Sequence, residues 1–262
     1  VKGGNQGYFQ YERWSLPGTT GKITDLTLSG ALGTQPEFSS YVQLAEAPAN
    51  VGEYYGARIR GWVTAPVTGL YQFAISSDND GQLFVSTDEH AFNKKKVASV
   101  SGYTNYRTFT SQAAQVSAPI QLEAGKKYYV EGLVVESYGG DHLSIGWKLL
   151  NQPDQVSLST MSVIGAQYIS SLTPDPLDLD GDSLPDAWEI AMGLNPNSAV
   201  GKDGEYGDPD KDTVPNFEEY QRGTHPLISG GFEGYWERQV WLNVPGDSVA
   251  DLIASPRFLQ KP

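Results

Sequence analysis

Two aspartate-rich stretches with the same spacing constrain this chain more than any other feature. DLDGDSLPDAWE begins at Asp178 and DPDKDTVPNFEE begins at Asp208, and both place side-chain oxygens at positions 1, 3, 5, 9 and 12. Position 7 is a leucine or a valine, whose backbone carbonyl can serve as a ligand. This is the ligand order of a twelve-residue calcium loop, in which the last glutamate binds through both oxygens. The predicted Ca²⁺ ligands are Asp178, Asp180, Asp182, Leu184, Asp186 and Glu189 in the first loop, and Asp208, Asp210, Asp212, Val214, Asn216 and Glu219 in the second.

The alternative is a solvated acidic linker, because runs of like charge are usually disordered. The repeated spacing argues against it, and so do the apolar and aromatic stretches that follow the loops, AWEIAMGLNP and FEEYQRGTHP, which end in Gly and then Pro as helices do. Position 6 holds Ser183 and Thr213, where an EF-hand has glycine. Because threonine tolerates positive φ poorly, we expect a loop path different from that of an EF-hand. The stretches resemble thrombospondin type 3-like calcium repeats, which join domains in bacterial surface proteins.

Most of the net charge lies in this acidic segment. The chain of 262 residues carries a formal charge of −13, and residues 173–227 contain 13 acidic and 3 basic residues. The nearly neutral remainder gives no electrostatic case for nucleic acid or an anionic membrane as a partner. There is no cysteine, so an extracellular protein of this sequence must be stabilised by its core and by metals. We find no apolar run long enough to insert in a membrane and no signal peptide, and interpret the chain as a mature excerpt of an extracellular or cell-surface protein.

Upstream of Leu172 the sequence is typical of β-structure. Short segments rich in Tyr, Val, Ile, Phe and Thr alternate apolar and polar residues between turn signals such as Asp80-Gly81. The clearest segments are ARIRGWVTA (57–65), GLYQFAISS (69–77), GQLFVST (81–87), KKYYVEGLVVES (126–137) and HLSIGWKLL (142–150). No convincing helical period precedes Asp186, so we predict an antiparallel sandwich or barrel. Its expected core residues are Ile59, Trp62, Tyr71, Phe73, Leu83, Phe84, Tyr129, Leu133, Ile145 and Trp147.

Four separated motifs in this region occur in the order known from one family. They are SSDND at 76–80, LFV at 83–85, AGKKYY at 124–129 and GGDHLSIGW at 139–147. Together, over roughly residues 5–170, they resemble a PA14 domain, the β-sandwich module of bacterial toxins, glycosidases, adhesins and yeast flocculins. The resemblance implies a mainly β fold, an antiparallel PA14-like β-sandwich, followed by a small calcium-binding loop-helix segment.

The resemblance also implies a second metal site. In sugar-binding PA14 domains, two consecutive acidic residues joined by a cis peptide bond hold a calcium ion together with an aspartate and backbone carbonyls of a facing loop. That ion binds vicinal sugar hydroxyls. Carried over, the pair is Asp78 and Asn79, and the facing loop contains Tyr138, Gly139, Gly140 and Asp141. Asn79 offers an amide oxygen in place of a carboxylate, which should weaken the site, and Asp80 is a candidate to compensate.

A polar turn is the alternative explanation for Asp78, Asn79 and Asp80, because Asx residues beside glycine are common between strands. The matching Gly140-Asp141 pair favours the metal site. Tyr103, Tyr106 and Tyr138 are candidates to stack on a sugar ring, although tyrosines near strand ends more often belong to the rim of a core.

We divide the chain into three parts: residues 1–172 as the PA14-like sandwich, 173–229 as the calcium-binding segment, and 230–262 as the start of a second PA14-like repeat or a C-terminal extension. The last assignment rests on YWERQVWLNVPGDSVADL from Tyr235, which loosely repeats YERWSLPGTTGKITDL from Tyr11. Chance, or a strand that completes the first domain, are the alternatives. Three scattered histidines and the lack of a nucleophile elbow, HExxH or phosphate loop argue against an enzyme.

Two functions fit these observations. The first is a calcium-dependent, adhesin-like carbohydrate-binding module of a large secreted or cell-surface bacterial protein, with glycans or polysaccharide as partners and a calcium-rigidified linker to neighbouring domains of the same polypeptide. The second is a calcium-stiffened stalk or spacer without sugar binding. An accessory domain of a glycosidase is a variant of the first.

Overall fold

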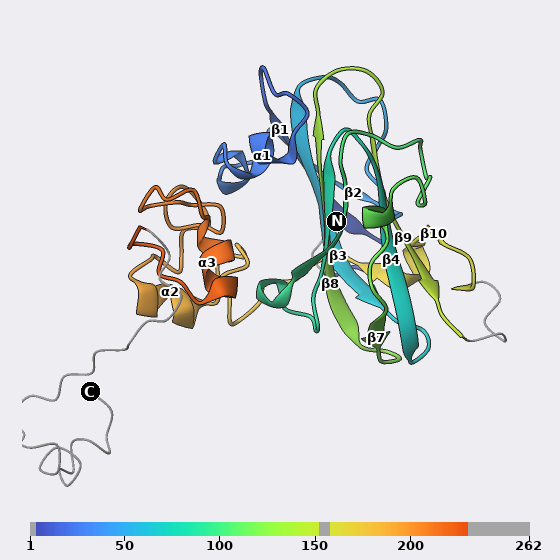
Figure 1. Ribbon diagram of the computed structural model, residues 1–262. Helices are drawn as coiled ribbons and strands as arrows, with labels where there is room; N and C mark the ends of the chain where they lie inside the picture. The colour runs from blue at the N-terminus through green and yellow to red at the C-terminus, as the bar shows by residue number, and fades with distance from the viewer. Residues whose placement is uncertain (1–3, 152–157, 230–262) are drawn as a thin grey trace, which may run out of the picture.

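The computed structural model describes residues 4–151 and 158–229, and its regular secondary structure is mainly antiparallel β-strands arranged in two sheets (Figure 1). The larger sheet has the strand order β2-β1-β3-β8-β5-β6, with β11 paired to β3, and the smaller has the order β10-β9-β4-β7. The predicted fold class is confirmed. The residues assigned to a second repeat, 230–262, lie outside the described part. The strands are β1 Phe9–Ser15, β2 Phe38–Val42, β3 Tyr55–Thr64, β4 Gly69–Asp78, β5 Gly81–Val85, β6 Lys95–Val100, β7 Ile120–Leu122, β8 Lys127–Glu136, β9 His142–Leu149, β10 Ser162–Val163 and β11 Ile169–Ser170.

The five segments with the clearest alternation form the five central strands β3, β4, β5, β8 and β9. In the larger sheet β3 pairs with β8 along its whole length, from Tyr55 opposite Glu136 to Thr64 opposite Lys127. Alternate residues of β8, among them Val130 and Val134, enter the apolar core that both sheets share. Successive side chains of a strand point to opposite faces, so the intervening residues of β8 face away from this core.

Six of the ten predicted core residues lie in the core between the sheets: Ile59, Tyr71, Phe73, Leu83, Ile145 and Trp147. The other four, Trp62, Phe84, Tyr129 and Leu133, alternate with core residues of their strands and therefore belong to the outer face of the larger sheet. Leu133, for example, packs with Leu26 in a second apolar cluster. Trp62, Tyr129 and Leu133 are buried as predicted, but outside the core between the sheets, and Phe84 is half-buried. Alternation alone cannot distinguish the two faces of a sheet that is covered on both sides.

A short helix that the sequence did not predict, α1 (Ile23–Thr27), covers part of this outer face. Its start is fixed by Asp25, whose Oδ2 accepts hydrogen bonds from the Thr20 amide at 2.7 Å and the Thr19 hydroxyl at 2.8 Å. A helix of five residues is too short to show a helical period in the sequence.

Residues 173–229 form a compact unit beside the sandwich, with the helices α2 (Asp186–Met192) and α3 (Asn216–Arg222) next to each other (Figure 1). Both helices end where predicted, at Gly193 and Gly223 in the left-handed conformation that glycine favours. The buried apolar cluster of this unit consists of Leu184, Leu194 and Phe217, with Trp188 edge-on to Tyr220. So small a core is a weak basis for independent stability. In the described ranges no helix is long and apolar enough to cross a membrane.

Candidate functional site

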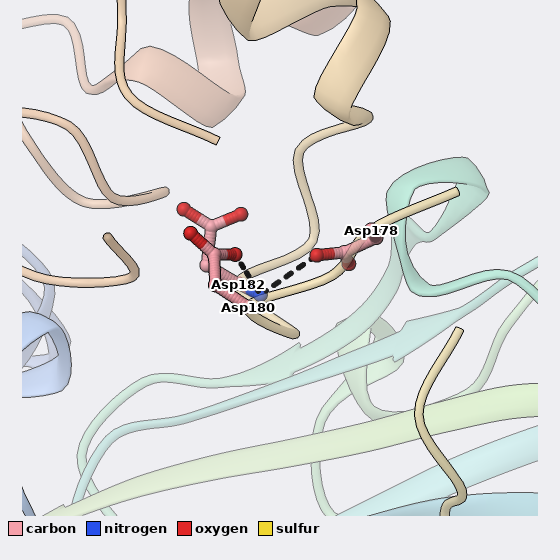
Figure 2. Close-up of side chains that lie close together, drawn as sticks. All are labelled: Asp178, Asp180 and Asp182. Atoms are coloured by element: carbon pink, nitrogen blue, oxygen red, sulfur yellow. Dashed lines mark hydrogen bonds between the residues drawn. The ribbon is translucent and has the colours of Figure 1, made fainter. Parts of the chain in front are cut away.

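The first predicted calcium loop brings three carboxylates together at the start of the acidic segment. Asp178, Asp180 and Asp182 each place an oxygen within 4.8 Å of the others. The loop is held in shape by the Asp182 amide, which donates to Asp178 Oδ1 at 3.1 Å and to Asp180 Oδ1 at 3.3 Å (Figure 2). The sequence therefore folds here so that alternate side chains converge on one centre, as the spacing predicts.

Glu189, at position 12 of this loop, is fully buried, and neither of its carboxylate oxygens has a hydrogen-bond partner within the described residues. Asp180 and Asp182 each have one buried oxygen in the same condition. Burial, followed by the charges of Asp180 and Asp178, raises the pKa of Glu189 to about 8. Burial and the charge of Asp180 raise the pKa of Asp182 to about 10. Buried carboxylates without partners are costly, and a hard divalent cation is the group that this oxygen set fits.

The second loop repeats the arrangement with Asp208, Asp210 and Asp212, whose oxygens also lie within 4.8 Å of one another. Asn216 donates its amide hydrogens to the carbonyls of Lys202 and Gly204 at 2.9 and 2.8 Å. Its Oδ1 is buried and has no hydrogen-bond partner among the described residues, so it is available as a ligand.

Glu219 closes this second loop, and its Oε2 is likewise buried without a partner. Burial and the neighbouring charge of Asp210 raise the pKa of Glu219 to about 7. The residues of both loops thus fit a bound calcium ion, which would neutralise the clustered carboxylates.

The loops keep the sharp turn of an EF-hand despite lacking glycine at position 6. Ser183 and Thr213 have φ values of 78° and 74°, so the expected difference in loop path at this position is wrong. The amide of Ser183 donates to Asp178 Oδ2 at 2.9 Å, and the amide of Thr213 donates to Asp208 Oδ2 at 3.0 Å. These bonds to the carboxylate at position 1 hold the residue in the left-handed region that its side chain disfavours.

In the absence of calcium, acid is expected to stabilise residues 173–229. The raised pKa values of Glu189 and Glu219 mean that the folded segment binds more protons than the unfolded chain at pH 5 to 8. Their contribution to stability is complete below the ordinary carboxyl pKa of about 4.5 and is lost as the pH rises through 7 and 8. Calorimetry in EDTA should therefore show a lower melting temperature for the segment at pH 8 than at pH 5.5. A calcium-free melting temperature that rises with pH would contradict this.

The acidic segment is joined to the sandwich through a buried cluster of charges. Glu205, from the stretch between the two loops, reaches Lys94 Nζ at 2.8 Å and Arg58 Nη1 at 3.0 Å. Lys94 in turn contacts Glu131 at 2.9 Å and the Ser183 hydroxyl of the first loop at 3.3 Å. Burial alone would raise the pKa of Glu131, but Lys94 and Arg58 outweigh it and lower that pKa to about 2. The segment is thus docked on the outer face of the larger sheet.

At one end of the sandwich, the turn between β4 and β5 faces the loop that leads into β9. The Asp78–Asn79 peptide bond is cis, as the PA14 resemblance implies. Asp78 is paired with His142 across β4 and β9, which places it next to Asp141. Both aspartates line an open hollow of about 390 Å³. Burial and the charge of Asp141 raise the pKa of Asp78.

Asp141 is almost fully buried, and its side chain holds the loop between β2 and β3. Its Oδ2 accepts from the amides of Val51 at 2.8 Å and Gly52 at 3.2 Å, while its Oδ1 is buried without a partner. The described residues bring three acidic ligand atoms within 4.8 Å of one another only in the two predicted calcium loops, so Asp78 and Asp141 do not belong to such a group. Further oxygens at this site must come from backbone carbonyls, waters or a ligand.

The side chains of the other two candidate ligands in this turn, Asn79 and Asp80, are bound by other residues. Asn79 Oδ1 accepts from the amide of Ser137 at 2.9 Å, and because that partner only donates, the oxygen of Asn79 must face Ser137. The nitrogen of Asn79 donates to Asp78 Oδ1 at 3.0 Å. Asp80 accepts from the Gly102 amide at 2.6 Å and lies 3.6 Å from Lys22 Nζ, so it does not compensate for the missing carboxylate as expected.

Two of the three candidate tyrosines border the hollow. Tyr103 and Tyr106 line it and are 67% and 50% exposed, and Gly140 lines it as well. Tyr138 is 74% exposed but is absent from the lining residues. The hollow therefore combines exposed aromatic rings with two aspartates, an arrangement suited to a small polar ligand such as a sugar.

One acidic residue at this end of the sandwich, Glu136, was not among the predicted site residues. It is fully buried, and burial followed by the charges of Asp78 and Asp141 raises its pKa to about 8. A signal was present: Glu136 follows Val130 and Val134 at the same parity along β8, and this parity faces the space between the sheets.

Comparison with known proteins agrees with the sandwich architecture. Residues 37–159 match the family model of the PA14 domain, so this part of the chain is a PA14 domain. Two Mus musculus proteins are similar over short stretches. N-acetyl-beta-glucosaminyl-glycoprotein 4-beta-N-acetylgalactosaminyltransferase 1 is 35% identical over 99 residues, covering 36% of this chain and 10% of that protein. Fibrocystin-L is 35% identical over 80 residues, covering 30% of this chain and 2% of that protein. The chain thus spans a tenth or less of the length of these curated relatives.

Among solved structures, the PA14 sugar-binding domain from an RTX adhesin superposes with a TM-score of 0.47 and 12% sequence identity. The superposition covers 64% of this chain and 99% of that domain.

Proposed function

We propose that residues 1–172 are a calcium-dependent carbohydrate-binding module of a large secreted or cell-surface bacterial protein, and that residues 173–229 are a thrombospondin type 3-like segment that binds two calcium ions. The observation that carries the proposal for the module is the open hollow in which Asp78 and Asp141 lie beside Tyr103 and Tyr106. A calcium ion held by the two aspartates would bind two adjacent sugar hydroxyls. The role assigned to the chain is binding, without catalysis.

The expected affinity of this site for a single sugar is low. Two hydroxyls would replace two waters on the ion, and one tyrosine ring would lie against the sugar, so the expected dissociation constant is millimolar, or about −4 kcal/mol. Several copies displayed on one surface would raise the avidity. A free glycan and a polysaccharide would present the same pair of adjacent hydroxyls to the ion.

Replacing Asp141 by asparagine is expected to abolish calcium-dependent sugar binding while the sandwich stays folded. Asparagine can still accept the hydrogen bonds from Val51 and Gly52 through Oδ1, but it removes the charge that would hold the ion. A glycan array followed by titration with the best hit measures the effect. The matched control is Glu123→Gln, an exposed residue between β7 and β8. Binding by the wild-type chain that persists in EDTA, or by the Asp141→Asn variant, would contradict the proposal.

A structural stalk unit is the second candidate, and one observation favours it. The oxygen of Asn79 is turned toward Ser137, so the turn offers one carboxylate where sugar-binding PA14 domains have two. In this alternative the calcium-loaded segment, docked through Glu205, stiffens the junction between domains and the hollow binds no sugar. Absence of sugar binding together with calcium binding at the two loops would select this function.

A further inference from the structure

The buried glutamates of this protein fall into two groups, those with a cationic partner and those without one, and Glu136 belongs to the second. In the described ranges six glutamates are buried: Glu12, Glu131, Glu136, Glu189, Glu205 and Glu219. The first group, Glu12, Glu131 and Glu205, forms ion pairs with arginine or lysine. The second group, Glu136, Glu189 and Glu219, has no ion pair within these ranges and leaves at least one carboxylate oxygen without a hydrogen-bond partner.

Two members of the second group close the calcium loops, where a cation would supply the missing charge. Glu136 resembles them, because both of its oxygens are fully buried and unpartnered. The charges that influence it most are acidic, those of Asp78, Asp141 and Glu53. None of these four carboxylates has an ion-pair partner in the part of the chain that the structure describes.

The backbone places Glu136 beside the Asp78–Asn79 turn of the proposed sugar site. The residues before and after it in the sequence bind Asn79: the Val135 carbonyl accepts from the Asn79 amide at 3.0 Å, and the Ser137 amide donates to Asn79 Oδ1 at 2.9 Å. The Glu136 side chain has the inward parity of β8 and so points to the space between the sheets, where β4 ends in Asp78.

We propose that Glu136 supplies, from the buried floor of the Asp78–Asp141 site, the second negative charge that Asn79 lacks. This deepens the proposed function and rests on it. Asn79 serves to position β8 through its bonds to Val135 and Ser137, while Glu136 carries the charge that a divalent cation requires. The site can then bind a divalent cation that prefers oxygen ligands, although only one residue of the cis pair is acidic.

The test follows calcium binding residue by residue in the full chain. In ¹H–¹⁵N spectra, the amides of Gly139 and Gly140 report the sandwich site, and that of Gly181 reports the first loop in the same titration. Glu136→Gln keeps the size of the side chain and removes its charge. It should raise the calcium midpoint of Gly139 and Gly140 at least about tenfold, since supporting groups at metal sites are worth about 10- to 100-fold in affinity. The midpoint of Gly181 should not change.

A second variant moves the charge instead of removing it. Glu136→Gln combined with Asn79→Asp should return the midpoint to within about threefold of the wild-type value, because the second charge then stands in the cis pair. The double variant also shows that glutamine is tolerated at position 136.

The outcomes distinguish failure of the proposed function from failure of the role assigned to Glu136. If wild-type Gly139 and Gly140 do not respond to calcium, the proposed function fails. If they respond and Glu136→Gln leaves their midpoint unchanged, Glu136 is a neutral buried acid and this inference alone is overturned. Failure of the double variant to recover binding, with its fold intact, would equally overturn it.

Discussion

Removal of calcium is expected to lower the free energy of unfolding of residues 173–229 by about 5 kcal/mol. At a hundredfold excess of calcium over the dissociation constant, each of the two loops contributes about 2.7 kcal/mol through binding linkage. Without the ions, the small core of Leu184, Leu194 and Phe217 must hold Glu189 and the other clustered carboxylates together unaided. Calorimetry in calcium and in EDTA measures the difference as a shift in the transition of this segment.

A matched variant controls for effects of the chelator on the sandwich. Glu189→Gln combined with Glu219→Gln removes the terminal ligand of each loop, so the transition of residues 173–229 should hardly shift between calcium and EDTA. If the wild-type chain melts identically in both buffers, the two loops do not bind calcium and the interpretation of their spacing is wrong.

Replacement of Lys94 by methionine is expected to destabilise the folded chain by about 3 to 5 kcal/mol, the usual cost of removing one partner from a buried ion pair. The Lys94 side chain is fully buried and lies 2.9 Å from Glu131 and 2.8 Å from Glu205. Methionine keeps an unbranched stem but removes the ammonium group, so that Glu131 and Glu205 share only Arg58 as a cation among the described residues. Urea unfolding in saturating calcium measures the loss as a lower midpoint with unchanged slope.

The comparison variant is Lys126→Met, which removes an exposed lysine paired only with Glu123 and should leave the midpoint unchanged. Adding Glu205→Gln to Lys94→Met should recover part of the lost stability, because one of the two carboxylates that share Arg58 is then neutral. A Lys94→Met variant that unfolds at the wild-type urea concentration would show that the charge cluster does not join the segment to the sandwich.

The docking of the acidic segment has a consequence for calcium-free protein. Lys94 contacts Ser183 within the first loop as well as Glu205 after it, so the loop and the outer face of the larger sheet share one set of buried contacts. Loosening of the loop on chelation is therefore expected to weaken the packing around Lys94. The acidic segment is therefore packed against the sandwich and is not a free spacer.

Local sequence patterns predicted those features that depend on neighbours along the chain. The alternation in β3, β4, β5, β8 and β9 reflects strands whose one face meets a shared core, and the Asp spacing reflects a loop that turns every second side chain toward one centre. The glycines at 193 and 223 end helices through a conformation that few other residues adopt.

Features that depend on distant partners could not be predicted in the same way. Lys94 lies in the basic run NKKK, a pattern typical of a solvated surface. It is nevertheless buried, and its partners Glu205 and Glu131 are more than 30 residues away in the sequence. The oxygen of Asn79 was expected to serve as a ligand, but Ser137, the residue after β8, donates hydrogen bonds to it. The positive φ of Thr213 depends on its bond to Asp208, which outweighs a local preference of the side chain.

The most direct test of the carbohydrate-binding account is a crystal structure of the full chain grown in calcium and soaked with monosaccharides, with calcium located by anomalous scattering. The two loops ending in Glu189 and Glu219 serve as internal references for occupied sites. The account predicts a further ion between Asp78 and Asp141, open to the hollow and in contact with two adjacent sugar hydroxyls. Ions in both loops with none between Asp78 and Asp141, or with one sealed from solvent there, would contradict it.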